Sequence, residues 1–450
     1  MTWIWERALW LLDGLWTYAL PFVIVLGVVV LFHEFGHYLV AKLFGITVEV
    51  FSVGFGPRIT GFKRGGTDYR LSWVPLGGYV KLKGEVPDES GAGPPDPGDL
   101  LSRPRWQRFL VFVMGAVFNL ITAVVVMAAL FMAGMEVDAY ESRPPVIGEV
   151  EPGSPAQVAG ILPGDRILSF GGQTVSTWKV LLPLVFLSPR QTKEVVLERG
   201  GRTFTTRLTL QSGPNDMGVP GFEPETGVMV ERVQAGWPAD KAGLKRGDQI
   251  VAIDGTPMTT RSRLLRTIQA AAGRPLRFTI ARQGATFETS IVPIEKEGRG
   301  MVGLQPDYLK VVKAYPFLEA VRQSLRENAE KAGLVFVTFK KLLRRELSMR
   351  AFSGPIDIYR VSGERAQEGL VPFLQLIAFF SLQLGIINLF PIPPLDGGHV
   401  FTILIEGAIR RDLSAQLKER AMQAGLVLLL LFMATILYFD ISKNVRDLFR

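Results

Sequence analysis

The sequence predicts a polytopic α-helical membrane protein with four transmembrane helices and a large insert between the second and the third. Three observations carry this prediction: four long stretches without a charged residue, basic residues gathered in two of the connecting loops, and an internal repeat within the longest connection. At 450 residues the chain has room for about three structural units.

Composition excludes several kinds of site. The chain has no cysteine, which rules out a disulfide scaffold, a thiol nucleophile and a cysteine-ligated metal. It has only three histidines, which leaves little room for a histidine-rich metal site. The formal net charge is +8, but the basic residues form no stripe interleaved with aromatic residues, so no nucleic-acid partner is expected.

The four uncharged stretches are predicted to span a membrane. About 20 apolar residues cross a hydrocarbon core roughly 30 Å thick. A buried core helix is the alternative for each stretch, but runs of this length rarely occur in soluble folds. The first stretch has neither a basic segment before it nor a small-residue cleavage site after it, so we do not expect a cleaved signal peptide. The stretches cover residues 15–32, 109–135, 371–390 and 421–439.

The loops predict the orientation, because basic residues in short loops mark the cytoplasmic side of a membrane protein. The segment before the first stretch contains only Arg7, whereas two loops are rich in lysine and arginine. Both termini and the segment 136–370 are therefore expected on the outer side. Three basic residues in the C-terminal tail give a mild opposing signal. The basic loop residues are Arg58, Lys63, Arg64, Arg70, Lys81, Lys83, Arg103 and Arg105, and then Arg410, Arg411, Lys418 and Arg420.

An HExxH motif stands at residues 33–37. Its two histidines, His33 and His37, lie on one face of a helix, where both imidazoles can bind one zinc ion, and Glu34 beside them can take a proton from water. Chance would produce this motif in roughly one such chain in a thousand. Tyr18 lies 15 residues before His33, about 22 Å along a helix, so we expect the motif within the bilayer near its cytoplasmic side.

The segment 136–310 contains a repeat. Each copy is predicted to run from a strand through a short proline-capped helix and a Gly-Asp turn to a second strand. The shared pattern, Ser/Trp-Pro-Ala-x-x-Ala-Gly-x-x-x-Gly-Asp-x-Ile, resembles PDZ domains of the bacterial protease type, and it implies two α+β domains that bind extended peptides by strand addition. The alternative is that either copy acts only as a spacer or lid. The matching pairs, all 83 positions apart, include Pro155 and Pro238, Gly160 and Gly243, Asp165 and Asp248, Ile167 and Ile250, and Gly172 and Gly255.

A helical stretch is predicted after the repeats, at residues 316–349. It fits either an amphipathic helix on the membrane surface or a helix packed on the second repeat. The apolar residues expected on one face are Phe317, Val321, Leu325, Ala332, Phe336, Phe339 and Leu343.

Two histidines leave a catalytic zinc short of a ligand, since such a site usually has three protein ligands and one open position. Residues 388–399 supply the candidates. Three prolines must break the third transmembrane helix there, and broken backbone at this depth is tolerated only where it is buried or lines a cavity. Asp396 is the favoured third ligand, and His399, one turn later, is its rival.

These motifs together resemble the site-2 protease family of intramembrane zinc metalloproteases. The resemblance rests on HExxH in the first transmembrane helix, Asn-x-x-Pro-x-Pro-x-Leu-Asp-Gly at residues 388–397, and PDZ-like domains between helices two and three. It implies that His33, His37 and Asp396 hold one zinc ion. It also implies that Glu34 is the catalytic base, that Asn388 contacts substrate, and that His399 is not a ligand.

The expected division of the chain follows. We expect the first transmembrane helix at 1–45, a cytoplasmic-side loop with a membrane-associated β-hairpin at 46–105, the second transmembrane helix at 106–135, extracytoplasmic PDZ-like domains at 136–221 and 222–310, an amphipathic helical linker at 311–370, the third transmembrane helix at 371–409, and the fourth with its tail at 410–450.

The resemblance implies regulated intramembrane proteolysis in a bacterial inner membrane. The substrate would be a single-pass membrane protein, such as an anti-sigma factor, that an upstream site-1 protease has already trimmed on the outer side. Two other function classes are considered. A membrane-anchored PDZ scaffold with a structural metal site would have no need of Glu34. A transporter is disfavoured because the four helices show no inverted repeat.

The loop 46–85 has strand-like alternation. Residues 47–53 can pair with residues 69–73 across Gly65-Gly66, and residues 77–82 can add another strand. A free strand edge would supply backbone partners to a substrate helix that has been unwound for cleavage, and Val50 and Leu71 are expected on that edge. The alternative is an ordinary cytoplasmic hairpin.

Overall fold

The computed structural model describes residues 15–85 and 96–448 and divides into two compact units. We call them the membrane unit, which comprises residues up to 134, 314–339 and 352 onward, and the insert unit, which comprises residues 135–313 and 340–351.

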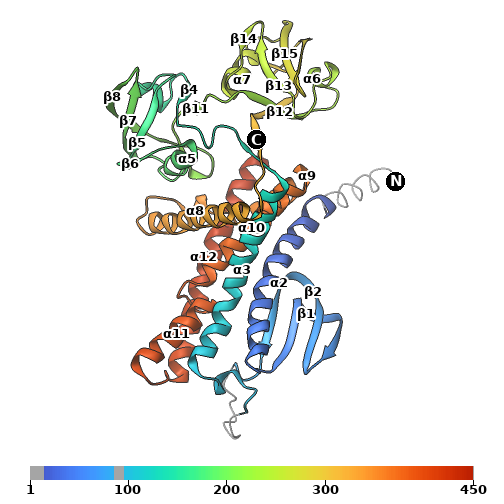
Figure 1. The fold of residues 1–450 in the computed structure, drawn as a ribbon, viewed down its shortest axis with the longest axis vertical. Coiled ribbons are helices and arrows are strands. Elements are labelled where there is room, and N and C mark those ends of the chain that lie inside the picture. The colour runs from blue at the N-terminus through green and yellow to red at the C-terminus, as the bar shows by residue number, and fades with distance from the viewer. Residues whose placement is uncertain (1–14, 86–95, 449–450) are drawn as a thin grey trace. The chain divides into compact units, whose positions relative to one another are not determined.

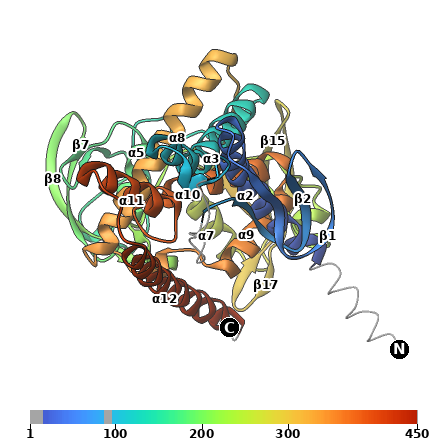
Figure 2. The ribbon, with the colours of Figure 1, turned by 90° about the horizontal axis from the view of Figure 1, so that it is seen from below.

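Four helices of the membrane unit are long and apolar enough to cross a membrane, which confirms the predicted number within the described residues. The first, α2, is preceded by a π-helical turn, η1. Helices α2, α3 and α10 pack against one another, whereas α12 lies at the edge of the unit, and most of its side chains are exposed (Figures 1 and 2). The bounds are Leu15–Ala19 for η1, Leu20–Leu43 for α2, Arg105–Ala133 for α3, Leu370–Asn388 for α10 and Ala415–Leu448 for α12.

Three further helices lie in the described residues of this unit. Helix α8 (Phe317–Leu343) continues into the insert unit at residue 340, α9 (Pro355–Glu368) precedes α10, and α11 (Asp396–Ile409) follows it. Helix α10 ends at Asn388 because the prolines that follow lack an N–H and cannot continue a helix, as the sequence predicted. Two short 3-10 turns, Leu100–Ser102 and Met349–Ala351, lie before α3 and before α9.

The buried face of α8 differs from the apolar face that the sequence predicted. The buried residues are Ala320, Ser324, Asn328 and Val335, and the hydroxyl of Ser324 donates to the carbonyl of Val124 in α3 at 2.7 Å. Much of the predicted apolar face remains exposed, including Phe317, Leu325 and Phe336. Ala332 and Phe339 of that face are partly buried and pack against a hydrophobic cluster that includes Leu382. In a membrane, helices meet through small and polar residues while apolar residues face lipid, so this exposure fits the membrane-contact alternative.

The loop after α2 folds into two long antiparallel strands, β1 (Val48–Arg64) and β2 (Thr67–Leu82), that lie against α2 (Figure 1). Both strands bend. Residues 50–53 therefore pair with residues 68–71 on one side and with residues 78–81 on the other, as the sequence predicted.

The expected free edge was placed wrongly. Val50 pairs with both Asp68 and Lys81, and Leu71 pairs with both Val53 and Thr60, so Val50 and Leu71 lie inside the sheet. The open edges are the segments 58–64 and 78–82. Sequence alternation identifies strands, but the two bends that decide which segment lies outermost depend on tertiary packing.

The insert unit begins and ends in a two-stranded stem. Strand β3 (Met135–Asp138) leaves α3 and pairs with β20 (Lys310–Lys313), which leads to α8. Between them, the two repeats form separate hydrophobic cores. Corresponding elements of the two repeats are offset by 83 residues. Helix α4 (Pro155–Val158) corresponds to α6 (Pro238–Lys241), and α5 (Trp178–Phe186) corresponds to α7 (Arg261–Gln269).

The repeated Gly-Asp turn has a structural reason. Asp165 and Asp248 are buried, and each accepts hydrogen bonds from an arginine that is also 83 residues from its counterpart, Arg199 and Arg282. The nitrogen–oxygen distance is 2.6 Å in both copies. Each repeat is therefore stabilised by the same ion pair between a buried aspartate and a partly exposed arginine.

The strands of the first repeat extend slightly beyond the expected boundary at residue 221. Strand β11 pairs with β4, so the first repeat continues to residue 224, and the second begins at β12. The first repeat contains β4 (Ile147–Val150), β5 (Arg166–Phe170), β6 (Gln173–Thr174), β7 (Thr192–Arg199), β8 (Arg202–Thr209), β9 (Gln211–Ser212), β10 (Gly218–Val219) and β11 (Phe222–Pro224). The second contains β12 (Val228–Val233), β13 (Gln249–Ile253), β14 (Thr256–Pro257), β15 (Leu276–Arg282), β16 (Ala285–Ile291), β17 (Ile294–Lys296), β18 (Arg299–Met301) and β19 (Leu304–Tyr308).

Candidate metal centre

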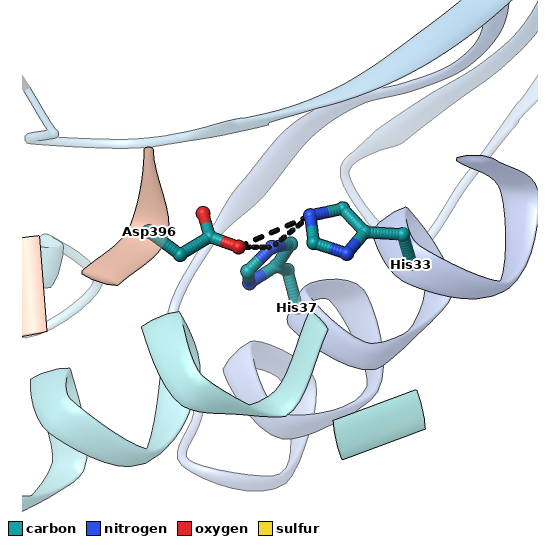
Figure 3. Close-up of side chains that lie close together, drawn as sticks. All are labelled: His33, His37 and Asp396. Carbon is teal, nitrogen blue, oxygen red and sulfur yellow. Dashed lines mark hydrogen bonds and ion pairs between the residues drawn. The ribbon is translucent and has the colours of Figure 1, made fainter. Parts of the chain in front are cut away.

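The three residues predicted to hold a metal lie together in the membrane unit (Figure 3). His33 and His37 stand one turn apart on α2 with their Nε2 atoms 3.3 Å apart. Asp396, the first residue of α11, places Oδ2 3.1 Å from His33 Nε2 and 3.4 Å from His37 Nε2. Asp396, which lies 363 positions after His33 and 359 after His37, thus converges with them on one point.

The donor set fits a zinc ion. One ligand atom from each of the three residues lies within 4.8 Å of the others, and both histidines are buried. Asp396 Oδ2 is also buried and accepts no conventional hydrogen bond within the described chain. A divalent cation would satisfy these three atoms at once, and two nitrogens, one carboxylate oxygen and an open position form a common catalytic zinc geometry.

The chain reaches this position through a tight reversal after α10. A β-carbon on Gly397 would lie 2.2 Å from the carbonyl oxygen of Phe390, and one on Gly398 would lie 2.7 Å from the nitrogen of Pro393. The two glycines therefore allow α11 to begin against the end of α10. This close return directs Asp396 toward α2.

Groups behind the histidines hold their rings. His37 Nδ1 lies 2.8 Å from the carbonyl oxygen of Val111, to which it can donate, and this leaves Nε2 free to bind a metal. The side-chain amide of Asn119 lies 3.3 Å from His33 Nδ1. Asn119 is fully buried in α3, and Ser381 of α10 donates to its backbone carbonyl at 2.9 Å.

Sequence reasoning did not identify Asn119 as a site residue. Its signal was a polar side chain in the middle of a transmembrane stretch, which is costly unless it has a partner. The amide oxygen of Asn119 can accept a hydrogen bond from the N–H at His33 Nδ1 once the amide oxygen and nitrogen are exchanged, since the two orientations have the same shape. Asn119 therefore belongs to the shell that orients the metal ligands.

Glu34 lies in the same cavity, which has a volume of about 210 Å³. Its Oε2 accepts a hydrogen bond of 3.0 Å from the backbone nitrogen of Val80, so strand β2 holds the carboxylate. The lining residues are His33, Glu34, His37, Tyr79, Val80, Leu82, Glu85, Val111, Phe112, Pro394, Asp396 and His399.

Asn388 and His399 occupy different parts of this site. Asn388 is buried at the end of α10, and its Nδ2 lies 3.2 Å from His33 Nε2, beside the metal position. His399 lines the cavity but is not part of the ligand cluster, and its ring stacks on Phe112 with 4.5 Å between centroids. The geometry therefore groups Asp396, rather than its rival His399, with the two histidines.

Comparisons with known proteins identify a peptidase family. The model of peptidase family M50 matches residues 21–432. A relative in Vibrio cholerae, which bears the name of a zinc metalloprotease, is 32% identical, and the alignment covers 96% of this chain and 99% of that protein. The regulator of sigma-E protease RseP of Escherichia coli is 31% identical over 96% of this chain and its own full length. A solved PDZ domain of an SdrC-like protein from Listeria monocytogenes aligns with 19% of this chain and 90% of its own at 23% identity, with a TM-score of 0.17.

Proposed function

This chain belongs to peptidase family M50 and is a zinc metalloprotease, and from that premise we propose that it hydrolyses a peptide bond within the transmembrane segment of a single-pass membrane protein. The observation that carries the proposal is the convergence of His33, His37 and Asp396 on one point, with Glu34 in the same cavity. One zinc ion per chain is assigned to these three ligands.

In this reaction Glu34 and Asn388 have separate tasks. His33, His37 and Asp396 would hold a zinc ion, which would supply Lewis acidity toward a water molecule and the carbonyl under attack. Glu34 takes a proton from the attacking water and returns it to the amide nitrogen as the carbon–nitrogen bond breaks. Asn388, whose amide can both donate and accept, holds the substrate backbone beside His33.

The depth of the site supports an intramembrane reaction. His33, Glu34 and His37 lie within the apolar helix Trp16–Leu43. We place the protein in the bacterial inner membrane with the cavity toward the cytoplasmic side, because the basic loops lie there. Nη2 of Arg105, at the start of α3, donates to Oδ1 of Asp412, between α11 and α12, at 2.8 Å. The basic loop before α3 and the basic loop between α11 and α12 therefore lie on the same side of the membrane.

The same loop rule places the insert unit and both termini on the outer side of the membrane. The exposed apolar residues around the bends of β1 and β2 support insertion of this hairpin into the membrane. They include Phe55, Ile59, Phe62, Trp73 and Val74.

A helical substrate must be unwound before its peptide bonds can react, since its own hydrogen bonds shield them. We infer that the released backbone pairs with the outer segment of β2, residues 78–82. Tyr79, Val80 and Leu82 of that segment line the cavity. An extended substrate would then lie between this edge and Asn388, which is the arrangement known as strand addition.

The relatives suggest the partner class. The names of the Escherichia coli and Salmonella typhimurium relatives refer to regulation of sigma E, so we propose an anti-sigma factor as substrate and an upstream site-1 protease that trims it first.

We also propose that the PDZ-like pair excludes substrates whose outward domain is still large. Deleting residues 140–308 keeps both strands of the stem, and it should allow cleavage of an untrimmed substrate. An untrimmed substrate that stays intact while trimmed substrate is still cut would contradict this filter.

A cleavage assay in detergent tests the main proposal. Purified protein and its Glu34→Gln variant are incubated with a panel of single-span helices, and products are mapped by mass spectrometry. We expect cuts within the apolar segments by the unaltered protein alone. Products that arise only from flanking loops, or equal cleavage by both proteins, would reject it. A zinc-containing protein that cuts no substrate would favour a PDZ scaffold with a structural metal.

A further inference from the structure

His399 occupies a distinctive position in the cavity. It follows Asp396 by three residues on α11, so the two side chains lie on the same face of that helix. The ring is stacked nearly parallel on Phe112, with an interplanar angle of 6°, which fixes its plane. No hydrogen bond engages its nitrogens within the part of the chain that the structure describes.

A hydrogen-bond donor aimed at the scissile carbonyl oxygen would assist this reaction. As water adds to the scissile carbonyl, the electron pair of the C=O bond moves to oxygen, and hydrogen-bond donors aimed at that oxygen lower the barrier. Most polar groups of the lining already have other tasks: three bind the metal, Glu34 moves the proton, and the N–H of Val80 is bonded to Glu34. Glu85 is a carboxylate and cannot donate when ionised.

Tyr79 and His399 remain as the uncommitted side-chain donors of the described lining. Tyr79 belongs to the strand that we assign to substrate pairing. His399 lies on a different element, α11, and its ring stacks on Phe112 of α3. A stacked imidazole cannot turn away from the cavity without losing that contact.

We propose that His399 is a catalytic residue that donates a hydrogen bond from a ring N–H to the scissile carbonyl oxygen as negative charge develops on it. The proposal rests on peptide hydrolysis at this cavity. His399 keeps its proton throughout, since the proton of the attacking water passes to Glu34 and then to the amide nitrogen while the carbon–nitrogen bond breaks.

Two substitutions separate donation from packing. His399→Phe keeps an aromatic ring over Phe112 but removes both nitrogens, whereas His399→Asn keeps a donor. Thr402→Val is the control, because Thr402 lies one turn later on α11 and its hydroxyl donates to the carbonyl of Gly398 within the helix. All proteins are assayed on an unstructured fluorogenic peptide in detergent, with zinc content measured in parallel.

The expected result is a fall in kcat of about 100-fold for His399→Phe, with KM within about twofold and zinc content unchanged. The kcat of His399→Asn should be at least roughly tenfold higher than that of His399→Phe. A phosphinic peptide imitates the tetrahedral intermediate with its charged oxygen. Its affinity for His399→Phe should fall by the same factor as kcat. Loss of zinc, an equal rise in KM, or kcat close to that of Thr402→Val would overturn the proposal. If the unaltered protein cuts the peptide but no membrane helix, the proposal of intramembrane cleavage is wrong. The same peptide assay still tests the proposed role of His399.

Discussion

The Nε2 atom of His37 lies 2.2 Å from the point where a β-carbon on Gly115 would stand. On the opposite side of the contact, a β-carbon on Gly36 would lie 2.3 Å from the carbonyl oxygen of Met114. Helices α2 and α3 therefore meet backbone to backbone beside a metal ligand. The position of His37 depends on the missing side chain of Gly115.

We expect Gly115→Ala to displace the ring of His37 and weaken zinc binding by at least roughly tenfold, because overpacking a tight contact costs about 1–3 kcal/mol. Zinc retained after dialysis against a chelator of known affinity measures the effect. Gly27→Ala is the matched control, since nothing lies within 4 Å of its added carbon. Equal zinc retention by both variants would show that the contact tolerates a methyl group.

Glu34→Gln should separate binding from chemistry. The amide cannot accept the proton of water, so cleavage should fall by roughly 100-fold or more, while zinc content stays the same because the three ligands are untouched. Glutamine can still accept the hydrogen bond from Val80 through its amide oxygen. Metal analysis and cleavage rate must be measured on the same preparation, and loss of zinc in this variant would place Glu34 among the ligands.

Asp396→Ala should release the zinc. It removes one of three ligands and leaves two histidines whose nitrogens face each other, which is a weak site for a divalent cation. His399→Ala serves as the comparison, because His399 lines the same cavity outside the ligand cluster. Full occupancy in Asp396→Ala combined with loss in His399→Ala would reverse the assignment.

The parts of this site that were predictable from sequence follow local rules. The spacing of His33 and His37 fixes a shared helix face, and the prolines after Asn388 must end a helix. The residues alone favoured Asp396 over His399 without excluding either, since both lie on one helical turn. The orientation of that turn toward α2 depends on Gly397 and Gly398, whose close contacts no local pattern reveals.

The face of α8 that packs was not predictable from sequence either. For the apolar face with Phe317 and Phe336 the sequence left two alternatives, contact with the membrane surface or packing on the second repeat. In a membrane, helices meet through small and polar residues, and Ser324 and Asn328 lie on the buried side of α8. Similarly, the contact between Asn119 and His33 joins two helices, and its geometry depends on how they pack.

Asn119→Leu should weaken zinc binding by about 10- to 100-fold, the range typical of partners that orient a metal-ligating histidine. Asn119→Asp keeps an acceptor for His33 Nδ1 and should retain most of the affinity. Ser381→Ala, which loses the hydrogen bonds from its hydroxyl to the backbone carbonyl and the side-chain oxygen of Asn119 but leaves the Asn119 amide in place, should have a smaller effect. Competition with a fluorescent zinc chelator provides the affinities, and a leucine variant with unaltered affinity would remove Asn119 from the metal site.

The last prediction concerns the unwinding of the substrate. If the scissile segment pairs with residues 78–82 of β2, the rate must depend on how easily the substrate helix opens. Single-span substrates with Gly, Pro, Ser or Asn near the cut should be cleaved faster than a polyleucine span, because these residues weaken a helix by up to about 1 kcal/mol each, and proline by about 3. The same residues in an unstructured peptide should change the rate little, since no helix has to be opened, and this comparison separates unwinding from side-chain preference. Proline at Val50 or Leu71 is expected to disrupt the sheet itself, as both residues pair on two sides, so those variants report hairpin stability. A panel in which polyleucine is cut as fast as the glycine- and proline-containing spans would show that opening of the helix does not limit the reaction.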